Sequence, residues 1–180
     1  METNLKLCTQ SQNREKLIIR EIAVLAVATA LLFASQVALA FLPNIEMVSL
    51  LVIIYTLVFR RKTLYIIYAF AILQGVMYGF GLWWVTYLYI WTILHIITNV
   101  FYKNESPLFW AIVGGAYGLA FGALSAIPTI VIGGIGAGVA WWISGMMFDV
   151  VHGIGNFVVI LILFKPLYLV MRGIANELTY

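Results

Sequence analysis

A long stretch without charged residues limits what this chain can fold into. From Thr63 to Tyr102 there is no Asp, Glu, Lys or Arg. A membrane-spanning helix needs roughly 20 residues, so the stretch is too long for one helix, and Gly75, Gly79 and Gly81 divide it near its middle. The whole chain is 64% hydrophobic and 9% charged, which excludes an ordinary water-soluble enzyme, a disordered tail and a nucleic-acid module. The sequence predicts an integral membrane protein.

The remaining apolar runs predict the other spans. They are continuous and do not alternate in short segments, so they favour a helical bundle over a membrane β-barrel. We predict an all-α integral membrane protein with six transmembrane helices in a compact bundle. The predicted parts are a cytoplasmic N-terminal segment at 1–21, a six-helix membrane domain at 22–172 and a cytoplasmic tail at 173–180. The spans outside the long stretch are Ile22–Ile45, Met47–Phe59, Pro107 to about Ala126, and about Val139 to Phe164.

Basic residues predict the orientation of these spans, because Lys and Arg near span ends are retained in the cytoplasm. All ten lie in the N-terminal segment and in alternate polar segments: Lys6, Arg14, Lys16, Arg20, Arg60, Arg61, Lys62, Lys103, Lys165 and Arg172. The other connections, at 43–46, 78–81 and 128–138, have none. Both termini are therefore predicted to be cytoplasmic, and the glycine-rich connection from Pro128 to Gly138 is predicted to face outside.

Ionisable side chains inside a membrane are costly, and they mark functional sites. Only His95, Asp149 and His152 qualify. Asp149, His152 and Asn156 lie at i, i+3 and i+7 on one helix face. Two interpretations are open. Asp149 and His152 pair with each other and lock helix packing, or the three side chains form a polar wall for a bound solute. On the second interpretation, removing Asp149 or Asn156 weakens binding more than removing Glu46.

Aromatic residues give a second signal. Trp84, Tyr87 and Trp91 follow helical spacing from the outer interface toward the interior. They belong either to an aromatic belt at the membrane surface or to one wall of a cavity for a flat organic ligand. Tyr78 adds a hydrogen-bonding group to such a cavity. Glu46 is the acidic residue of the connection after the first span, and it is either part of the site or solvated.

Small residues give a third signal. Ala26, Ala30, Ala34 and Ala38 recur every four positions of the first span and make a ridge that another helix can approach closely. The ridge serves either packing inside the bundle or docking of a separate membrane subunit. A comparable surface on the fifth span consists of Gly114, Gly115, Gly118 and Gly122.

Several chemistries lack their sequence motifs. No glycine-rich loop carries the lysine of a phosphate-binding P-loop, and neither a zinc-protease helix nor a nucleophile elbow is present. Cys8 is the single cysteine. We therefore predict a protein that is not an enzyme and that needs neither a metal nor a cofactor.

Together these features resemble a known family. The basic N-terminus, the alanine-rich first helix, the turn Leu42–Glu46, the Gly- and Trp-rich segment Tyr78–Trp84 and the polar face around Asn156 look like the substrate-binding S component of an energy-coupling factor (ECF) vitamin transporter. The resemblance covers about Arg20 to Arg172. It implies a vitamin-binding protein of the bacterial plasma membrane that works with a transmembrane coupling subunit and two cytoplasmic ATPases, without nucleic acid.

The resemblance also implies particular residues. In the family, two alanines four residues apart in the first helix contact the coupling subunit. If Glu21, Ile22 and Ala23 set the register, the second position is Val27, a departure from the pattern, whereas Ala26 and Ala30 keep the spacing. The predicted subunit contacts are Ala23, Ala26, Ala30 and Ala34. The predicted binding residues are Asn44, Glu46, Tyr78, Trp84, Tyr87, Trp91, Asp149, His152 and Asn156.

The resemblance leaves several vitamins open as the ligand. The chain looks most similar to the S components assigned to cobalamin. Carriers of thiamine, riboflavin, pyridoxine and queuosine precursors share the architecture, and a cationic ligand such as thiamine would favour Glu46, Asp149 and an aromatic cage. A different class remains open: an autonomous proton-coupled carrier that uses Asp149 and His152 as a proton relay.

Overall fold

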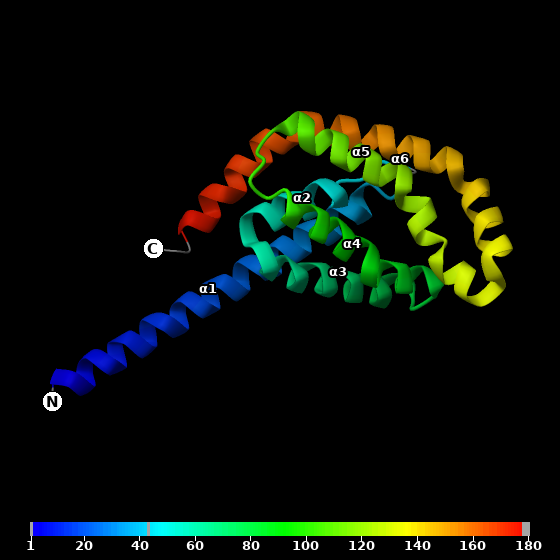
Figure 1. The fold of residues 1–180 in the computed structure, drawn as a ribbon. Coiled ribbons are helices and arrows are strands. Elements are labelled where there is room, and N and C mark those ends of the chain that lie inside the picture. Colours follow the sequence, from blue (N-terminus) through cyan, green and yellow to red (C-terminus); the bar gives the residue numbers. More distant parts are fainter. Residues whose placement is uncertain (1, 43, 178–180) are drawn as a thin grey trace.

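The computed structural model describes residues 2–42 and 44–177 (Figure 1). Over these residues the chain is helical apart from short connections, as predicted. The helices are α1 (Glu2–Ala38), α2 (Val48–Phe59), a 3₁₀ turn η1 (Arg60–Lys62), α3 (Thr63–Tyr78), α4 (Leu82–Val100), α5 (Pro107–Ser125) and α6 (Ile127–Glu177).

Helix α2 forms the centre of the bundle. Every residue from Val48 to Thr56 is buried, and α2 contacts each of the other five helices. A helix that is apolar on all sides is stable only when it is surrounded, which explains its position. Its 12 residues extend about 18 Å, well short of the ~30 Å hydrocarbon core of a bilayer. The predicted span Met47–Phe59 is thus a short helix buried within the bundle.

Three helices are long and apolar enough to cross a membrane. They are Leu17–Ala38 within α1, Pro107–Ser125 (α5) and Ile127–Glu177 (α6). Helix α3 has 16 residues and is shorter, while α4 alternates its apolar residues with Trp, Tyr and Thr. The chain therefore has the composition and the long helices of a membrane protein.

The outer helices extend past the predicted boundaries. Helix α1 continues without a break on both sides of residue 22, and α6 continues past residue 172 to Glu177. The first span was predicted to reach Ile45, but the helix ends at Ala38. In Figure 1 the beginning of α1 and the end of α6 lie on one side, and the turn between α5 and α6 lies opposite.

The prediction of a loop from Pro128 to Gly138 is wrong, because this segment belongs to a helix. It is helical except at Gly134, where φ is 82° and ψ is 171°, a conformation that essentially only glycine adopts. Pro128 lies in the first turn of α6, where its missing N–H costs no hydrogen bond. One glycine therefore redirects α6, and no separate loop is needed.

Helices α5 and α6 approach closely along the glycines of α5. A Cβ atom added to Gly118 would lie 2.8 Å from Gly153 Cα, and one added to Gly115 would lie 3.3 Å from the Gly153 carbonyl oxygen. The glycine surface predicted on the fifth span thus serves packing within the chain. This contact fixes the position of α6, whose polar face is described below.

Contacts gather the basic segments at one end of the bundle. Lys62 forms an ion pair with Glu21 of α1, and Arg172 Nη1 lies 2.9 Å from Glu105 Oε1. The Arg60 guanidinium lies 3.9 Å above the centre of the Tyr102 ring. We call this region, formed by residues 60–62, 102–105 and 172, the basic end.

Candidate functional site

A cavity of about 260 Å³ lies away from the basic end, where the α1–α2 connection meets α4, α5 and α6. We call it the acidic cavity. Chain segments far apart in sequence contribute to it, as is typical of ligand sites between helices. Its lining residues are Gln36, Leu39, Ala40, Leu42, Asn44, Ile45, Glu46, Tyr87, Trp91, Phe121 and His152.

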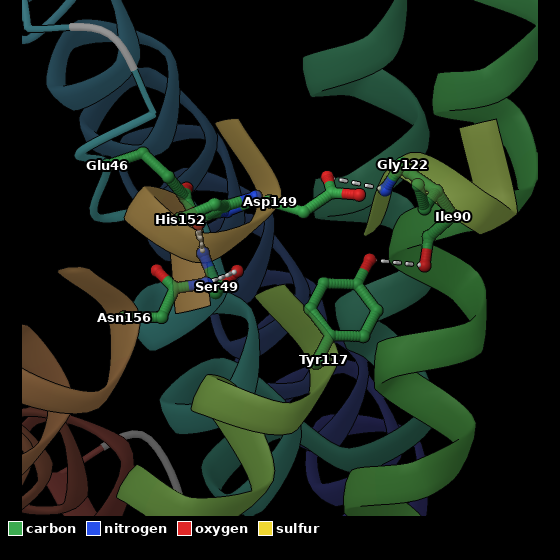
Figure 2. Close-up of polar contacts among 8 residues, drawn as sticks. All are labelled: Glu46, Ser49, Ile90, Tyr117, Gly122, Asp149, His152 and Asn156. Carbon is green, nitrogen blue, oxygen red and sulfur yellow. Dashed lines mark hydrogen bonds and ion pairs between the residues drawn. The ribbon is translucent and has the colours of Figure 1, made fainter. Parts of the chain in front are cut away.

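Glu46 and His152 form a buried pair in this cavity. His152 Nε2 lies 3.2 Å from Glu46 Oε1, and the two residues are 4% and 9% exposed. The Ser49 N–H donates to both carboxylate oxygens, at 3.2 and 3.1 Å, so Glu46 also caps the start of α2. Figure 2 shows Glu46 reaching His152 from the α1–α2 connection. Glu46 is therefore a buried, paired carboxylate, and the interpretation of Glu46 as a solvated loop residue is wrong.

Asp149 has different partners from those predicted. Its Oδ1 accepts a hydrogen bond from the Gly122 N–H at 2.9 Å, and its Oδ2 accepts one from Trp142 Nε1 at 3.2 Å. Asp149 therefore joins α6 to α5, where the absence of a side chain at Gly122 makes room for the carboxylate (Figure 2). The predicted Asp149–His152 pair is wrong, because the Glu46 carboxylate takes His152 instead. Asp149 does not line the acidic cavity.

Asn156 lies one turn after His152 on α6, and it contacts a neighbour of the acidic cavity without lining the cavity itself. Its Nδ2 donates to Ser49 Oγ at 3.1 Å, which ties α6 to α2 (Figure 2). Ser49 in turn holds Glu46 through its N–H. The three residues predicted on one face of α6 are all buried, but only His152 of them lines the cavity. The predicted ranking of Asp149 and Asn156 above Glu46 in ligand binding therefore gains no support from this geometry.

Two of the predicted aromatic residues, Tyr87 and Trp91, line the acidic cavity. Their rings meet edge to face with centres 5.7 Å apart, and the Trp91 ring lies 5.8 Å from that of Phe121. Trp91 is 2% exposed, and its indole N–H has no hydrogen-bond partner among the described residues. Buried donors are nearly always paired, so an unpaired indole N–H is unusual in a residue that lines a cavity.

The other two predicted aromatics lie elsewhere. Trp84 Nε1 donates to the Ala71 carbonyl oxygen at 2.8 Å, and its ring meets Phe80. Trp84 therefore joins α4 to α3, because α3 packs against this part of α4. Tyr78, at the end of α3, is 53% exposed and does not line the cavity. Asn44 does line it, in a left-handed conformation with φ of 57°.

Sequence reasoning missed Phe121 and Ser49. The Phe121 ring lies 4.8 Å from the His152 ring and closes the cavity on the α5 side. It stands within an apolar helix, so its sequence context carries no signal. Ser49 follows Glu46 by three residues at the start of an apolar run, a spacing that suits an acidic cap accepting from a helical N–H.

A second cavity, of about 350 Å³, adjoins the first. Tyr87 and Phe121 line both, so their rings stand between them. Trp83, Trp141 and Pro128 are among the residues on the far side. This cavity lies where α4 begins and where α5 meets α6, near the break at Gly134.

The predicted subunit contacts share one feature. All four alanines predicted as contacts are exposed in the described structure, beside the exposed apolar residues Ile22, Val27 and Leu31. They do not pack inside the bundle, which removes the packing interpretation for these positions. The four are Ala23, Ala26, Ala30 and Ala34.

Metal binding has no geometric support in the part of the chain that the structure describes. No three His, Cys, Asp or Glu side chains there lie close enough together to hold a metal ion. His95 lies apart from Asp149 and His152, in the basic half of α4, where Thr56 and Asn99 bind its ring.

Comparison of the chain with protein-family models, with curated proteins and with solved structures gives no match. The chemistry of the acidic cavity is therefore the basis for assigning a function.

Proposed function

We propose that this chain is a solute-binding membrane subunit that holds a small, nitrogen-containing organic ligand in the acidic cavity. The observation that carries the proposal is the convergence there of the paired carboxylate of Glu46 and the ring of His152 with the aromatic rings of Tyr87, Trp91 and Phe121. Aromatic walls with a few convergent polar groups are the usual composition of a ligand site.

The charge of the site favours a cationic or protonated ligand. Among the described residues that line the cavity, Glu46 carries the one carboxylate, and none is Lys or Arg. A carboxylate has about four acceptor positions, and the Ser49 N–H and His152 leave part of this capacity free. The rings of Tyr87, Trp91 and Phe121 complete an environment in which a cation is attracted to aromatic faces.

The volume of the cavity favours a small ligand. Ligand pockets usually enclose about 300–1,000 Å³, and the acidic cavity, at about 260 Å³, lies just below that range. Among the vitamins named above, thiamine and pyridoxine suit this size. Cobalamin stays a prediction that requires a much larger space, reached only if Tyr87 and Phe121 turn aside and join the two cavities.

The same proposal includes a role in an ECF-type importer. The exposed alanine face of α1 supports docking of a coupling subunit, since small residues let two helices approach closely in lipid. On this proposal the ATPases belong to the partner proteins, and the chain captures the ligand on the side of the membrane opposite the basic end.

Ligand binding by the purified chain tests the proposal. Detergent-purified protein is incubated with thiamine, pyridoxine, riboflavin, a queuosine precursor and cobalamin, and retained ligand is identified by mass spectrometry. We expect one small vitamin to be retained without ATP. Glu46→Gln should weaken its binding by at least about 30-fold, since losing one member of a buried charged pair costs 2 kcal/mol or more.

The matched control is Glu105→Gln, which removes a carboxylate that pairs with Arg172 at the basic end and should leave binding unchanged. If folded wild-type protein retains no vitamin, or if both variants bind as the wild type does, the proposal fails. Uptake by this chain alone, driven by a proton gradient, would instead assign the Glu46–His152 pair to an autonomous carrier.

A further inference from the structure

A third cavity, of about 790 Å³, lies at the basic end. We call it the basic cavity. It is bounded by the end of α2, by η1, by the start of α3 and by the second half of α4. Three consecutive cations line it, Arg60, Arg61 and Lys62, and its lining contains no carboxylate. This cavity plays no part in the function proposed above.

Arg60 is held in an unusual conformation. Its φ is 56° and its ψ is −128°, a positive-φ conformation that favours glycine. Its N–H donates to the Thr56 carbonyl oxygen at the end of α2, and its guanidinium rests on the Tyr102 ring. These contacts leave Nη1 buried without a hydrogen-bond partner among the described residues. A buried guanidinium nitrogen is a strong donor, so the site has an unmet need for an acceptor.

The neighbouring groups add positive charge or none. Arg61 is exposed at the mouth of the cavity. Lys62 pairs with Glu21, which itself lies outside the lining. His95 Nε2 accepts a hydrogen bond from Asn99 Nδ2 at 2.8 Å, and Nδ1 meets Thr56 Oγ1 at 3.0 Å. Both ring nitrogens of His95 thus have partners from α2 and α4.

The other half of the cavity is apolar and faces outward. Leu64, Ile96 and Val100 line it, and Ile96 and Val100 are 56% and 68% exposed. A free phosphate ion would use the cations and gain nothing from this apolar wall. A phospholipid would use both, because its phosphate is anionic and its acyl chains are apolar.

We propose that the basic cavity is a binding site for the phosphate headgroup of an anionic phospholipid, with Arg60 and Arg61 as its main ligands and the Ile96–Val100 wall beside the acyl chains. Arg forms two parallel hydrogen bonds to a phosphate, and Arg61 is exposed at the mouth of the cavity, where a headgroup can reach it. The positive-inside rule puts the basic end in the cytoplasmic leaflet, where anionic lipids attract clusters of Lys and Arg.

Native mass spectrometry of the full chain tests this proposal. The protein is extracted from vesicles of phosphatidylglycerol and phosphatidylcholine in equal amounts, and retained lipid is counted. We expect one phosphatidylglycerol to be retained in preference to phosphatidylcholine. Arg61→Gln, an exposed position that does not threaten folding, should reduce this retention about fivefold, and Arg60→Gln about tenfold, from the worth of one charge-assisted contact.

The matched control is Lys165→Gln, which removes one charge from an exposed position of α6 outside the cavity and should leave retention unchanged. An equal loss in Lys165→Gln and Arg61→Gln would overturn the proposal, since the attraction would then be general. Displacement of the lipid by millimolar glycerol phosphate would also overturn it, by showing that a soluble phosphate ester suffices. Thermal unfolding of each variant separates loss of binding from loss of fold.

Discussion

The acidic cavity and the basic cavity lie along the same helix. Tyr87, Trp91, His95 and Asn99 recur every four residues of α4, which puts them on one face. The first two line the acidic cavity and the last two line the basic cavity. In the first, the carboxylate of Glu46 has partners from α2 and α6, whereas in the second the guanidinium of Arg60 keeps an unused donor. One helix face thus serves two chemistries, and the segments packed against it set the charge at each end.

The largest expected difference between the two ends is in the cost of removing a carboxylate. Glu46→Ala leaves His152 and the Ser49 N–H without their acceptor, and breaking a buried pair costs about 3–5 kcal/mol of unfolding free energy. Glu21→Ala removes an exposed ion pair with Lys62 of the basic end and should cost less than about 1 kcal/mol. Reversible unfolding in mild detergent measures both. Equal losses would contradict the burial of the Glu46–His152 pair.

A smaller loss of unfolding free energy is expected for a substitution at Thr56, which lies between the basic cavity and the core. Thr56→Val removes the hydroxyl group that meets His95 Nδ1 and leaves a buried ring N–H unpaired, at a cost of about 2 kcal/mol. Thr98→Val is the control, because the buried Thr98 hydroxyl bonds only to the Leu94 carbonyl oxygen of its own helix. It should cost less than about 1 kcal/mol. If both variants unfold alike, Thr56 does not hold His95 in place.

The sequence predicts the helices better than it predicts the side-chain partners. Apolar runs and glycines predicted helices in the regions of α2 to α5, because these features act locally. The partners of Asp149 and His152 depend on which helix packs opposite them, and helical spacing describes only the face that they share. His152 meets Glu46 across 106 positions of sequence, and Asp149 finds its place because Gly122 has no side chain.

The length of α6 shows the same limit. Four glycines between Gly133 and Gly138 predicted a loop, yet only Gly134 leaves helical geometry. Glycine permits a left-handed conformation without requiring it, so packing decides which glycine of a cluster bends the chain. Buried charge follows the same logic: the sequence identified Glu46 and His152 as candidates, and only the fold brings them together.

The unpaired indole N–H of Trp91 leads to a prediction about ligand affinity. Trp91→Phe removes an indole N–H that has no partner among the described residues, so it should lose only the stability that a smaller ring costs in the core, while affinity for the retained ligand should fall about tenfold, the equivalent of one hydrogen bond. Trp110→Phe is the control, because Trp110 Nε1 donates to the Asn104 carbonyl oxygen at 2.8 Å. That variant should lose stability and keep its affinity. The reverse pattern would show that the Trp91 N–H serves the fold.

The smallest expected effect is the coupling between the two cavities. Glu46→Gln changes the acidic cavity and Arg61→Gln the mouth of the basic one, and the two residues share no hydrogen-bond or ion-pair partner among the described residues. Stabilities of distant, independent sites add to within about 0.5 kcal/mol, so the double variant should equal the sum of the two single variants. Lipid retention should likewise be the same with and without Glu46→Gln.

A larger coupling would overturn the independence of the two cavities and would identify α4 as the connection between them. The stripe Tyr87, Trp91, His95, Asn99 is the continuous structure that could transmit it, since the His95 ring is held between Thr56 of α2 and Asn99 of the same helix. Measuring the same two single variants and the double variant in the Thr56→Val background tests that route. If coupling is present and disappears when this hydroxyl group is removed, the headgroup site regulates the solute site through α4. If it persists, the coupling runs through another helix.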